Sequence, residues 1–140
     1  MEVKKTFLIT ALPLICLENF NPTEIEIGYL TEKIKIYKFH DHYYYNDAVV
    51  GEFEITKQQY NDFVNSRDLV IIKKTRYQIP LSAKIIVDLC IYHGDIPSTA
   101  TVSFTNENET NDFPKQNWFG EDVSEKINSM EYQFSKKKNL

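Results

Sequence analysis

The sequence predicts an α+β protein, mainly antiparallel β, whose strands form a closed or nearly closed barrel with a few flanking helices. Short segments that alternate apolar and polar residues dominate the chain and are rich in Ile, Val, Tyr, Phe and Thr, as half-buried strands are. Only four glycines and five prolines interrupt the 140 residues. A chain of this length is about one domain by the usual prior. We therefore expect residues 1–140 to form a single domain.

Eight segments have the alternation that predicts a strand. In chain order they are residues 2–9, 24–30, 33–39, 42–47, 51–56, 69–79, 83–92 and 100–105. Many antiparallel strands with few helices are typical of a barrel, in which the strands pair with one another around an axis.

The alternation breaks at residues 57–66, where the sequence predicts a helix. Tyr60, Phe63 and Val64 have the spacing of one helix face, and Thr56 is a residue type that caps a first turn. Two more helices are expected, one beginning near Glu107 and one within residues 126–140.

Composition and charge exclude several classes of protein. Cys16 and Cys90 lie far apart in apolar stretches, which is the pattern of buried free thiols and favours a reducing, cytoplasmic compartment. The apolar residues 7–17 are too few to span a bilayer and are interrupted by Pro13, so we expect neither a signal peptide nor a membrane helix. A formal net charge of -4 argues against general nucleic-acid binding. Any anion site must therefore be a local concentration of cations.

Five of the segments place like polar residues two apart, with a mostly apolar residue between them. The pairs are Glu2 with Lys4, Lys33 with Lys35, Glu52 with Glu54, Lys74 with Arg76, and Thr101 with Ser103. Residues two apart in a strand share a face. These polar residues either face solvent, as is usual in antiparallel sheets, or point into the interior of the barrel. Periodicity alone favours solvent, and the order of the segments has to decide.

That order resembles the CYTH domain of the triphosphate tunnel metalloenzymes over nearly the whole chain. "MEVKKTFLI" looks like a degraded Glu-x-Glu-x-Lys strand, and "IEIGYL" is similar to the family's Gln-Gly-Tyr-Leu segment. "GEFEI" resembles its Glu-x-Glu middle strand, "IIKKTRYQIP" its Lys-x-Arg-Tyr strand and "VDLCIY" its Val-Asp-x-Phe strand. "DFPKQNWFGEDVS" is similar to its Pro-x-Trp-x-Gly-x-Glu-Val-Thr end. The resemblance implies an eight-stranded antiparallel tunnel that holds a polyphosphate chain.

The resemblance also implies two sets of site residues. Phosphate oxygens form charge-assisted hydrogen bonds with lysine and arginine, and hard divalent cations take carboxylate ligands. The ligand-binding cations would be Lys4, Lys33, Lys35, Lys74 and Arg76. The candidate metal ligands would be Glu2, Glu52, Glu54 and Asp88, and the resemblance identifies no catalytic residue.

This chain departs from the family pattern at three acidic positions. Lys4 stands in place of the second glutamate of the first strand, and Thr101 and Ser103 stand where the family has its second Glu-x-Glu. Three carboxylates expected to hold the catalytic metal are thereby missing. The sequence therefore predicts a degenerate member that binds a phosphate-rich small anion and hydrolyses it slowly or not at all. Binding requires no cofactor on this hypothesis, and magnesium or manganese would serve only a remaining hydrolysis.

Two other functions stay open at the level of the sequence. The remaining carboxylates could support an active metal-dependent triphosphatase. Alternatively, the barrel could be a non-enzymatic scaffold for a protein partner, for which the aromatic residues of "HDHYYYND" would supply a contact surface.

Overall fold

The computed structural model describes residues 3–12, 16–82, 85–104, 108–109, 113 and 116–137, and of residue 137 it describes the backbone alone. The chain divides into two compact units. The first contains Met1–Pro22 and Thr75–Ile127, and the second contains Thr23–Lys74 and Asn128–Leu140. Glu2 lies outside the described residues, as does Glu107, the expected start of a short helix.

In the part of the chain that the structure describes, nine strands form one sheet in the order β5-β4-β3-β2-β6-β7-β8-β1-β9. The strands in chain order are β1 (Val3–Ile9), β2 (Thr23–Thr31), β3 (Ile34–Phe39), β4 (His42–Asp47), β5 (Gly51–Ile55), β6 (Ile71–Pro80), β7 (Ile86–Tyr92), β8 (Thr99–Phe104) and β9 (Phe119–Asp122). The helices whose bounds lie within the described residues are the short 3-10 helix η1 (Leu17–Asn19), α1 (Lys57–Ser66) and α3 (Ile127–Lys137).

The fold class expected from the sequence is confirmed, because helices are few among the described residues and β1 pairs antiparallel with β8 and β9, β3 with β2 and β4, β4 with β5, and β7 with β8. Within the described residues the strand order is open, since it begins with β5 and ends with β9. The additional strand β9, which the sequence did not predict, lies beside β1. The expected helix at residues 57–66 has the same bounds as α1, and the final helix is α3. No helix of the described residues is both long and apolar enough to cross a membrane.

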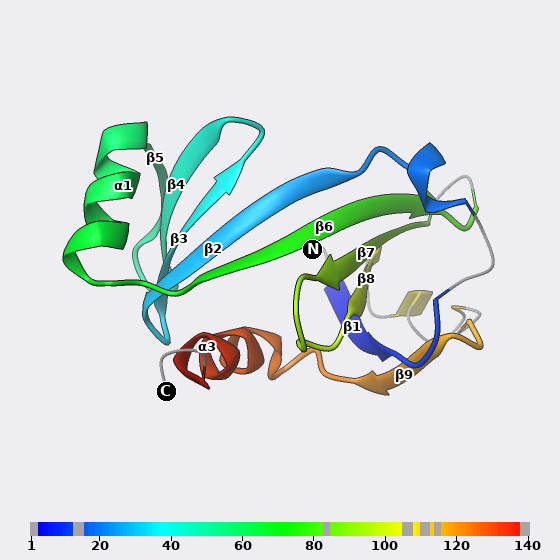
Figure 1. Ribbon diagram of the computed structural model, residues 1–140. Helices are drawn as coiled ribbons and strands as arrows, with labels where there is room; N and C mark the ends of the chain where they lie inside the picture. The colour runs from blue at the N-terminus through cyan, green and yellow to red at the C-terminus, as the bar shows by residue number, and fades with distance from the viewer. Residues whose placement is uncertain are drawn as a thin grey trace. The chain divides into compact units, whose positions relative to one another are not determined.

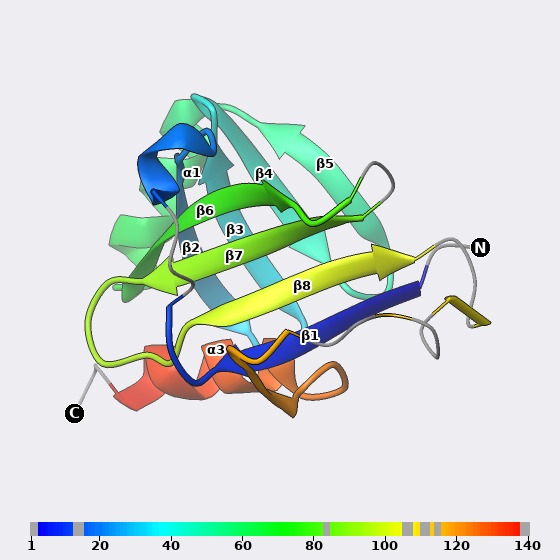
Figure 2. The ribbon, with the colours of Figure 1, turned by 90° about the vertical axis from the view of Figure 1, so that its right-hand side faces the viewer.

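The first unit places β1 between β8 and β9, and β8 also pairs with β7 (Figure 2). The apolar side chains of one sheet face form its core. Leu89 and Ala100 face each other on β7 and β8, and both are completely buried. Phe7 of β1 stacks on Phe119 of β9 with 5.0 Å between the ring centroids. This core fixes the strands whose opposite face carries the polar residues described below.

The second unit contains the consecutive strands β2 to β5 together with α1 and α3 (Figure 1). Its core forms where α1 packs against β4 and its neighbours, with Ile36, Ile55 and Tyr60 as the buried residues. Thr56 caps α1 in a capping box, because its hydroxyl accepts from Gln59 N while the Gln59 side chain accepts from Thr56 N. The face of these strands that holds Tyr29, Lys35 and Glu52 is opposite to Ile36.

The two cysteines differ from each other in exposure. Both are free; Cys90 is buried within β7, as expected, whereas Cys16 is exposed. The expectation that both thiols are buried is therefore wrong for Cys16, because this residue immediately precedes η1 and is not part of a packed strand.

Candidate functional site

The registers of β2 to β5 gather four polar side chains in one row of the second unit. Tyr29 on β2 is opposite Lys35 on β3, Lys35 is opposite Asn46 on β4, and Asn46 is opposite Glu52 on β5. Directly opposite residues of antiparallel strands project from the same face. A lysine therefore lies in the middle of a polar row that crosses four strands.

Lys35 is half-buried in this row. Its Nζ lies 3.5 Å from Asn128 Oδ1 of α3 and 5.9 Å from the centroid of the Tyr29 ring. Burial lowers the pKa of Lys35 below the ordinary lysine value. The charge of Glu131 opposes this decrease in pKa, and the charge of Lys74 adds to it. Lys35 and Lys74 are therefore close enough for their positive charges to interact.

Lys74 forms an ion pair with a buried carboxylate of α3. Its Nζ donates to Glu131 Oε2 at 3.0 Å, and the exposed fractions of the two side chains are 16% and 4%. The other carboxylate oxygen, Glu131 Oε1, accepts from the Tyr29 hydroxyl at 2.6 Å. Burial, followed by the charge of Glu131, raises the pKa of Tyr29, so this hydroxyl stays protonated and donates. Both oxygens of Glu131 thus contact groups on the strands.

Sequence reasoning missed Glu131, although a signal for it exists. In "INSMEYQF" the apolar residues Ile127, Met130 and Phe134 recur at helical spacing, and Glu131 falls on that same stripe. A carboxylate on the inward stripe of an amphipathic helix needs a partner inside the protein. Strand periodicity indicated Lys74 together with Arg76, and it gave no indication that a carboxylate of a helix is the partner of Lys74.

The two glutamates of β5 contact other side chains of the second unit. Glu52 Oε1 accepts from the Tyr37 hydroxyl at 2.5 Å and from Asn46 Nδ2 at 3.1 Å. Glu54 Oε2 lies 3.0 Å from His42 Nδ1. Burial, followed by the hydrogen bond to Glu52, raises the pKa of Tyr37. Both glutamates are exposed.

The first unit has its own polar row, on β7, β8 and β1. Asp88 is opposite Thr101, and Thr101 is opposite Thr6. The hydroxyls of Thr6 and Thr101 are 2.9 Å apart and hydrogen-bonded. Asp88 Oδ1 is buried, and no hydrogen-bond partner for this atom occurs among the described residues. Lys4 is exposed on β1, opposite Ser103.

The structure thus brings together some of the predicted site residues and not others. Lys35 and Lys74 share a face with Glu52 and with the unpredicted Glu131. Lys33 lies outside the strands, in the exposed turn between β2 and β3. Lys4, Arg76 and Asp88 belong to the first unit, where Arg76 is half-buried on β6.

The candidate metal ligands do not form a cluster in the part of the chain that the structure describes. No group of three or more His, Cys, Asp or Glu side chains there could hold a metal ion. Glu52 and Glu54 accept hydrogen bonds from neighbouring side chains, and Asp88 lies in the other unit. These described residues do not fit a divalent-metal centre.

Comparison with solved structures places the fold. Two crystal structures of the protein NE1496 match this chain at 21% identity. One, described as a hypothetical protein, has a TM-score of 0.71, and the match covers 91% of this chain and 92% of that chain. The other, described as an inorganic triphosphatase, has a TM-score of 0.70, and the match covers 91% of this chain and 89% of that chain. A Bacillus halodurans protein classed provisionally as an adenylate cyclase matches at 10% identity with a TM-score of 0.50, covering 84% of this chain and 94% of that chain. The sequence matches no family model and no curated protein. The chain has a CYTH-type fold, as its sequence indicated.

Proposed function

We propose that this chain binds a small phosphate-rich anion, polyphosphate or a nucleotide, through cations on the polar faces of its strands. The observation that carries the proposal is the pair Lys35 and Lys74 in the second unit, both of which lie beside Tyr29 and its partner Glu131. Lys35 Nζ is 5.9 Å from the centroid of the Tyr29 ring, and Lys74 Nζ donates to the carboxylate that accepts from the Tyr29 hydroxyl. Two half-buried lysines close together repel each other, and a multiply charged anion relieves that repulsion through charge-assisted hydrogen bonds. The fold shared with an inorganic triphosphatase supports phosphate as the ligand class.

The remaining predicted cations stay part of the proposal. Arg76 follows Lys74 by two residues on β6, so strand alternation gives both side chains the same face. Lys4 and Lys33, which are exposed, also stay candidate phosphate ligands. In this view residues 1–140 act as one CYTH-like domain in the cytoplasm, with a small anion as partner and without general nucleic-acid binding.

Metal-dependent hydrolysis is lost or weak in this proposal. Its support is the replacement of three family carboxylates by Lys4, Thr101 and Ser103. The contacts of the β5 glutamates also support the loss of hydrolysis. Glu52 accepts hydrogen bonds from Tyr37 and Asn46, and Glu54 contacts His42. Carboxylates that bind a metal must instead point their oxygens at the ion. Magnesium or manganese is then not required for binding.

Tripolyphosphate is expected to raise the melting temperature of the protein in the absence of any divalent metal. A ligand that binds only the folded state stabilises it by about 2.7 kcal/mol at a concentration of 100 times its Kd. The increase should be much smaller for Lys35→Met, which removes one of the two cations. Lys38→Met is the matched control, because Lys38 lies on the same strand with the opposite orientation and the variant has the same net charge. The measurement is a thermal-shift titration with and without Mn²⁺.

Each other result of that titration would contradict the proposal in a different way. A shift that appears only with Mn²⁺ would indicate an active metal-dependent site. Equal shifts for Lys35→Met and Lys38→Met would remove Lys35 from the site. No shift under any condition would favour a protein-binding scaffold.

Tripolyphosphate binding is also expected to weaken as the pH rises. This weakening should begin at a lower pH than the value of about 10.4 at which ordinary lysines titrate. The pKa of Lys35 is lowered by burial, so this cation loses its charge earlier than an exposed lysine as the pH rises. In the ligand-free protein, Lys35→Met should stabilise the fold at neutral pH, where the charged form is buried at a cost. That gain should begin to fall as the pH rises past the lowered pKa of the folded state, and it should be gone above the ordinary lysine pKa, where Lys35 is neutral in the unfolded state as well. Calorimetric titration and urea unfolding at several pH values test both effects; a Kd that stays constant until ordinary lysines titrate would contradict the assignment.

A further inference from the structure

The carboxylate of Glu131 contacts Lys74 in the way that an external anion would. It accepts from Lys74 Nζ at 3.0 Å, and the charge of Glu131 acts on Lys35 as well. A phosphate oxygen bound to Lys74 would accept a hydrogen bond from the same Nζ atom. Glu131 and a ligand therefore compete for this cation, whichever other groups hold the ligand.

If a ligand took the place of Glu131 at Lys74 while α3 stayed in position, the Glu131 carboxylate would be buried without its cation, which costs free energy. The residue is only 3% exposed, and a buried carboxylate separated from its cation retains its full desolvation cost. The hydrogen bond from the Tyr29 hydroxyl compensates part of that cost. The remainder is avoided when Glu131 reaches water, which requires α3 to shift away from the strands.

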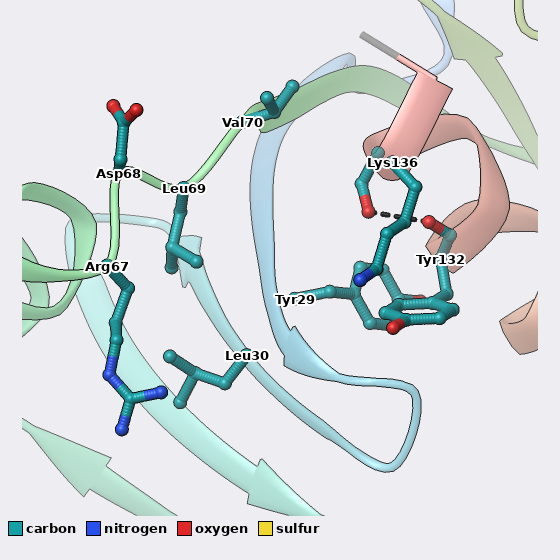
Figure 3. A pocket seen from close by; sticks show the side chains of 9 residues that line it. Tyr29, Leu30, Arg67, Asp68, Leu69, Val70, Tyr132 and Lys136 are labelled. Atoms are coloured by element: carbon teal, nitrogen blue, oxygen red, sulfur yellow. Dashed lines mark hydrogen bonds between the residues drawn. The ribbon is translucent and has the colours of Figure 1, made fainter. Parts of the chain in front are cut away.

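The packing around the C-terminal half of α3 leaves room for such a shift. A cavity of about 180 Å³ lies between α3 and the segment that joins α1 to β6. Figure 3 shows Tyr132 and Lys136 of α3 beside Tyr29, with Arg67 and Leu69 on the other side of the cavity. The Tyr29 and Tyr132 rings meet edge to face with centroids 5.8 Å apart, so Tyr29 contacts both the cavity and Glu131. Helix α3 is therefore less tightly packed here than it would be over a filled core.

From this geometry we propose that Glu131 is a built-in competitor for the anion site, so that ligand binding displaces its carboxylate from Lys74 and loosens α3. The inference rests on the proposed anion binding at Lys35 and Lys74. One carboxylate charge competes poorly with several phosphate charges on one ligand, and it competes well with a singly charged anion. Glu131 would thus keep the site closed to small monoanions and open to polyphosphates.

Glu131→Gln tests this inference, because glutamine keeps the size and the acceptor oxygen for Tyr29 while removing the competing charge. The Kd for tripolyphosphate, measured by calorimetry without metal, is expected to fall by roughly tenfold, within the usual range of coupling between two sites. Glu125→Gln is the matched control: Glu125 is exposed just before α3, and its replacement changes the net charge by the same amount. It should leave the Kd nearly unchanged at physiological ionic strength.

Hydrogen exchange of the wild-type protein provides a second readout that needs no variant. Tripolyphosphate should speed the exchange of the α3 amides while slowing that of β6 around Lys74. Tyr29→Phe, which removes one hydrogen bond to Glu131, should lower the Kd in the same direction by a smaller factor. Equal affinities of wild type, Glu131→Gln and Tyr29→Phe, together with unchanged α3 exchange, would overturn the competitor role and leave anion binding intact. If tripolyphosphate binds none of the variants, both the competitor role and the proposed function are wrong.

Discussion

Replacing Lys74 with methionine is expected to lower the free energy of unfolding by about 3–5 kcal/mol, the usual cost of removing one member of a buried ion pair. Methionine fills a similar volume, so the loss reflects the charge of Glu131, which is left in a nearly dry environment without Lys74. The exposed fractions of the two side chains, 16% and 4%, place the pair among buried ones. Urea unfolding of the variant and the wild type measures the difference.

Two further variants show whether the loss of stability comes from the broken ion pair or from removing a lysine of β6 in general. Lys73→Met is the matched control, because Lys73 is the exposed neighbour on the opposite face of β6, and it should change stability by less than about 0.5 kcal/mol. Adding Glu131→Gln to Lys74→Met should recover most of the loss, since no carboxylate is then buried without Lys74. If the double variant loses the sum of the two single losses, Lys74 and Glu131 are not energetically coupled.

The sequence predicted the strands well because their two faces have different environments. In β3, Ile36 is completely buried under α1 while Lys35 and Tyr37 are half-buried on the other face, which is the alternation seen in the sequence. The bounds of α1 were predictable for a local reason as well, since Thr56 and Gln59 form its capping box within four residues. Strand β9 was missed because four residues, "FGED", carry too little alternation to recognise.

The candidate site was only partly predictable, because its decisive contact joins residues far apart in the chain. Lys74 and Arg76 were visible as two cations on one face of a strand. The ion pair with Glu131 spans 57 positions and depends on where α3 lies, which strand periodicity does not report. Lys33 was assigned to a strand by alternation, whereas the turn after β2 contains it and leaves it exposed.

The polar row of the first unit, which contains Asp88, Thr101 and Thr6, is where the proposed loss of a metal site can be tested. Lys4 and Ser103 are opposite each other on the same face as this row, so all three departures from the family pattern lie on β1 and β8 of the first unit (Figure 2). Glutamate at position 101 would be opposite Asp88, and glutamates at positions 4 and 103 would be opposite each other two residues farther along the same face. Without metal they repel one another, and with a divalent cation they become ligands.

The triple variant Lys4→Glu, Thr101→Glu, Ser103→Glu is therefore expected to bind Mn²⁺ with a Kd lower than that of the wild type by at least about tenfold, or ~1.4 kcal/mol. In the absence of metal it should be less stable than the wild type, partly because the hydrogen bond between Thr6 and Thr101, worth about 1 kcal/mol, is lost. Mn²⁺ should restore that stability, since it binds the folded state. Calorimetry and thermal unfolding with and without Mn²⁺ measure both effects.

The variant with glutamine at the same three positions has side chains of the same size without the charges, and it should neither bind Mn²⁺ nor be stabilised by it. If Mn²⁺ binds the wild type as tightly as the glutamate variant, the chain retains a metal site built from other residues, and the loss of hydrolysis we propose is wrong. If the glutamate variant alone binds Mn²⁺ and also hydrolyses tripolyphosphate, three substitutions on β1 and β8 account for the loss. The function missing from the wild type is then that of the metal.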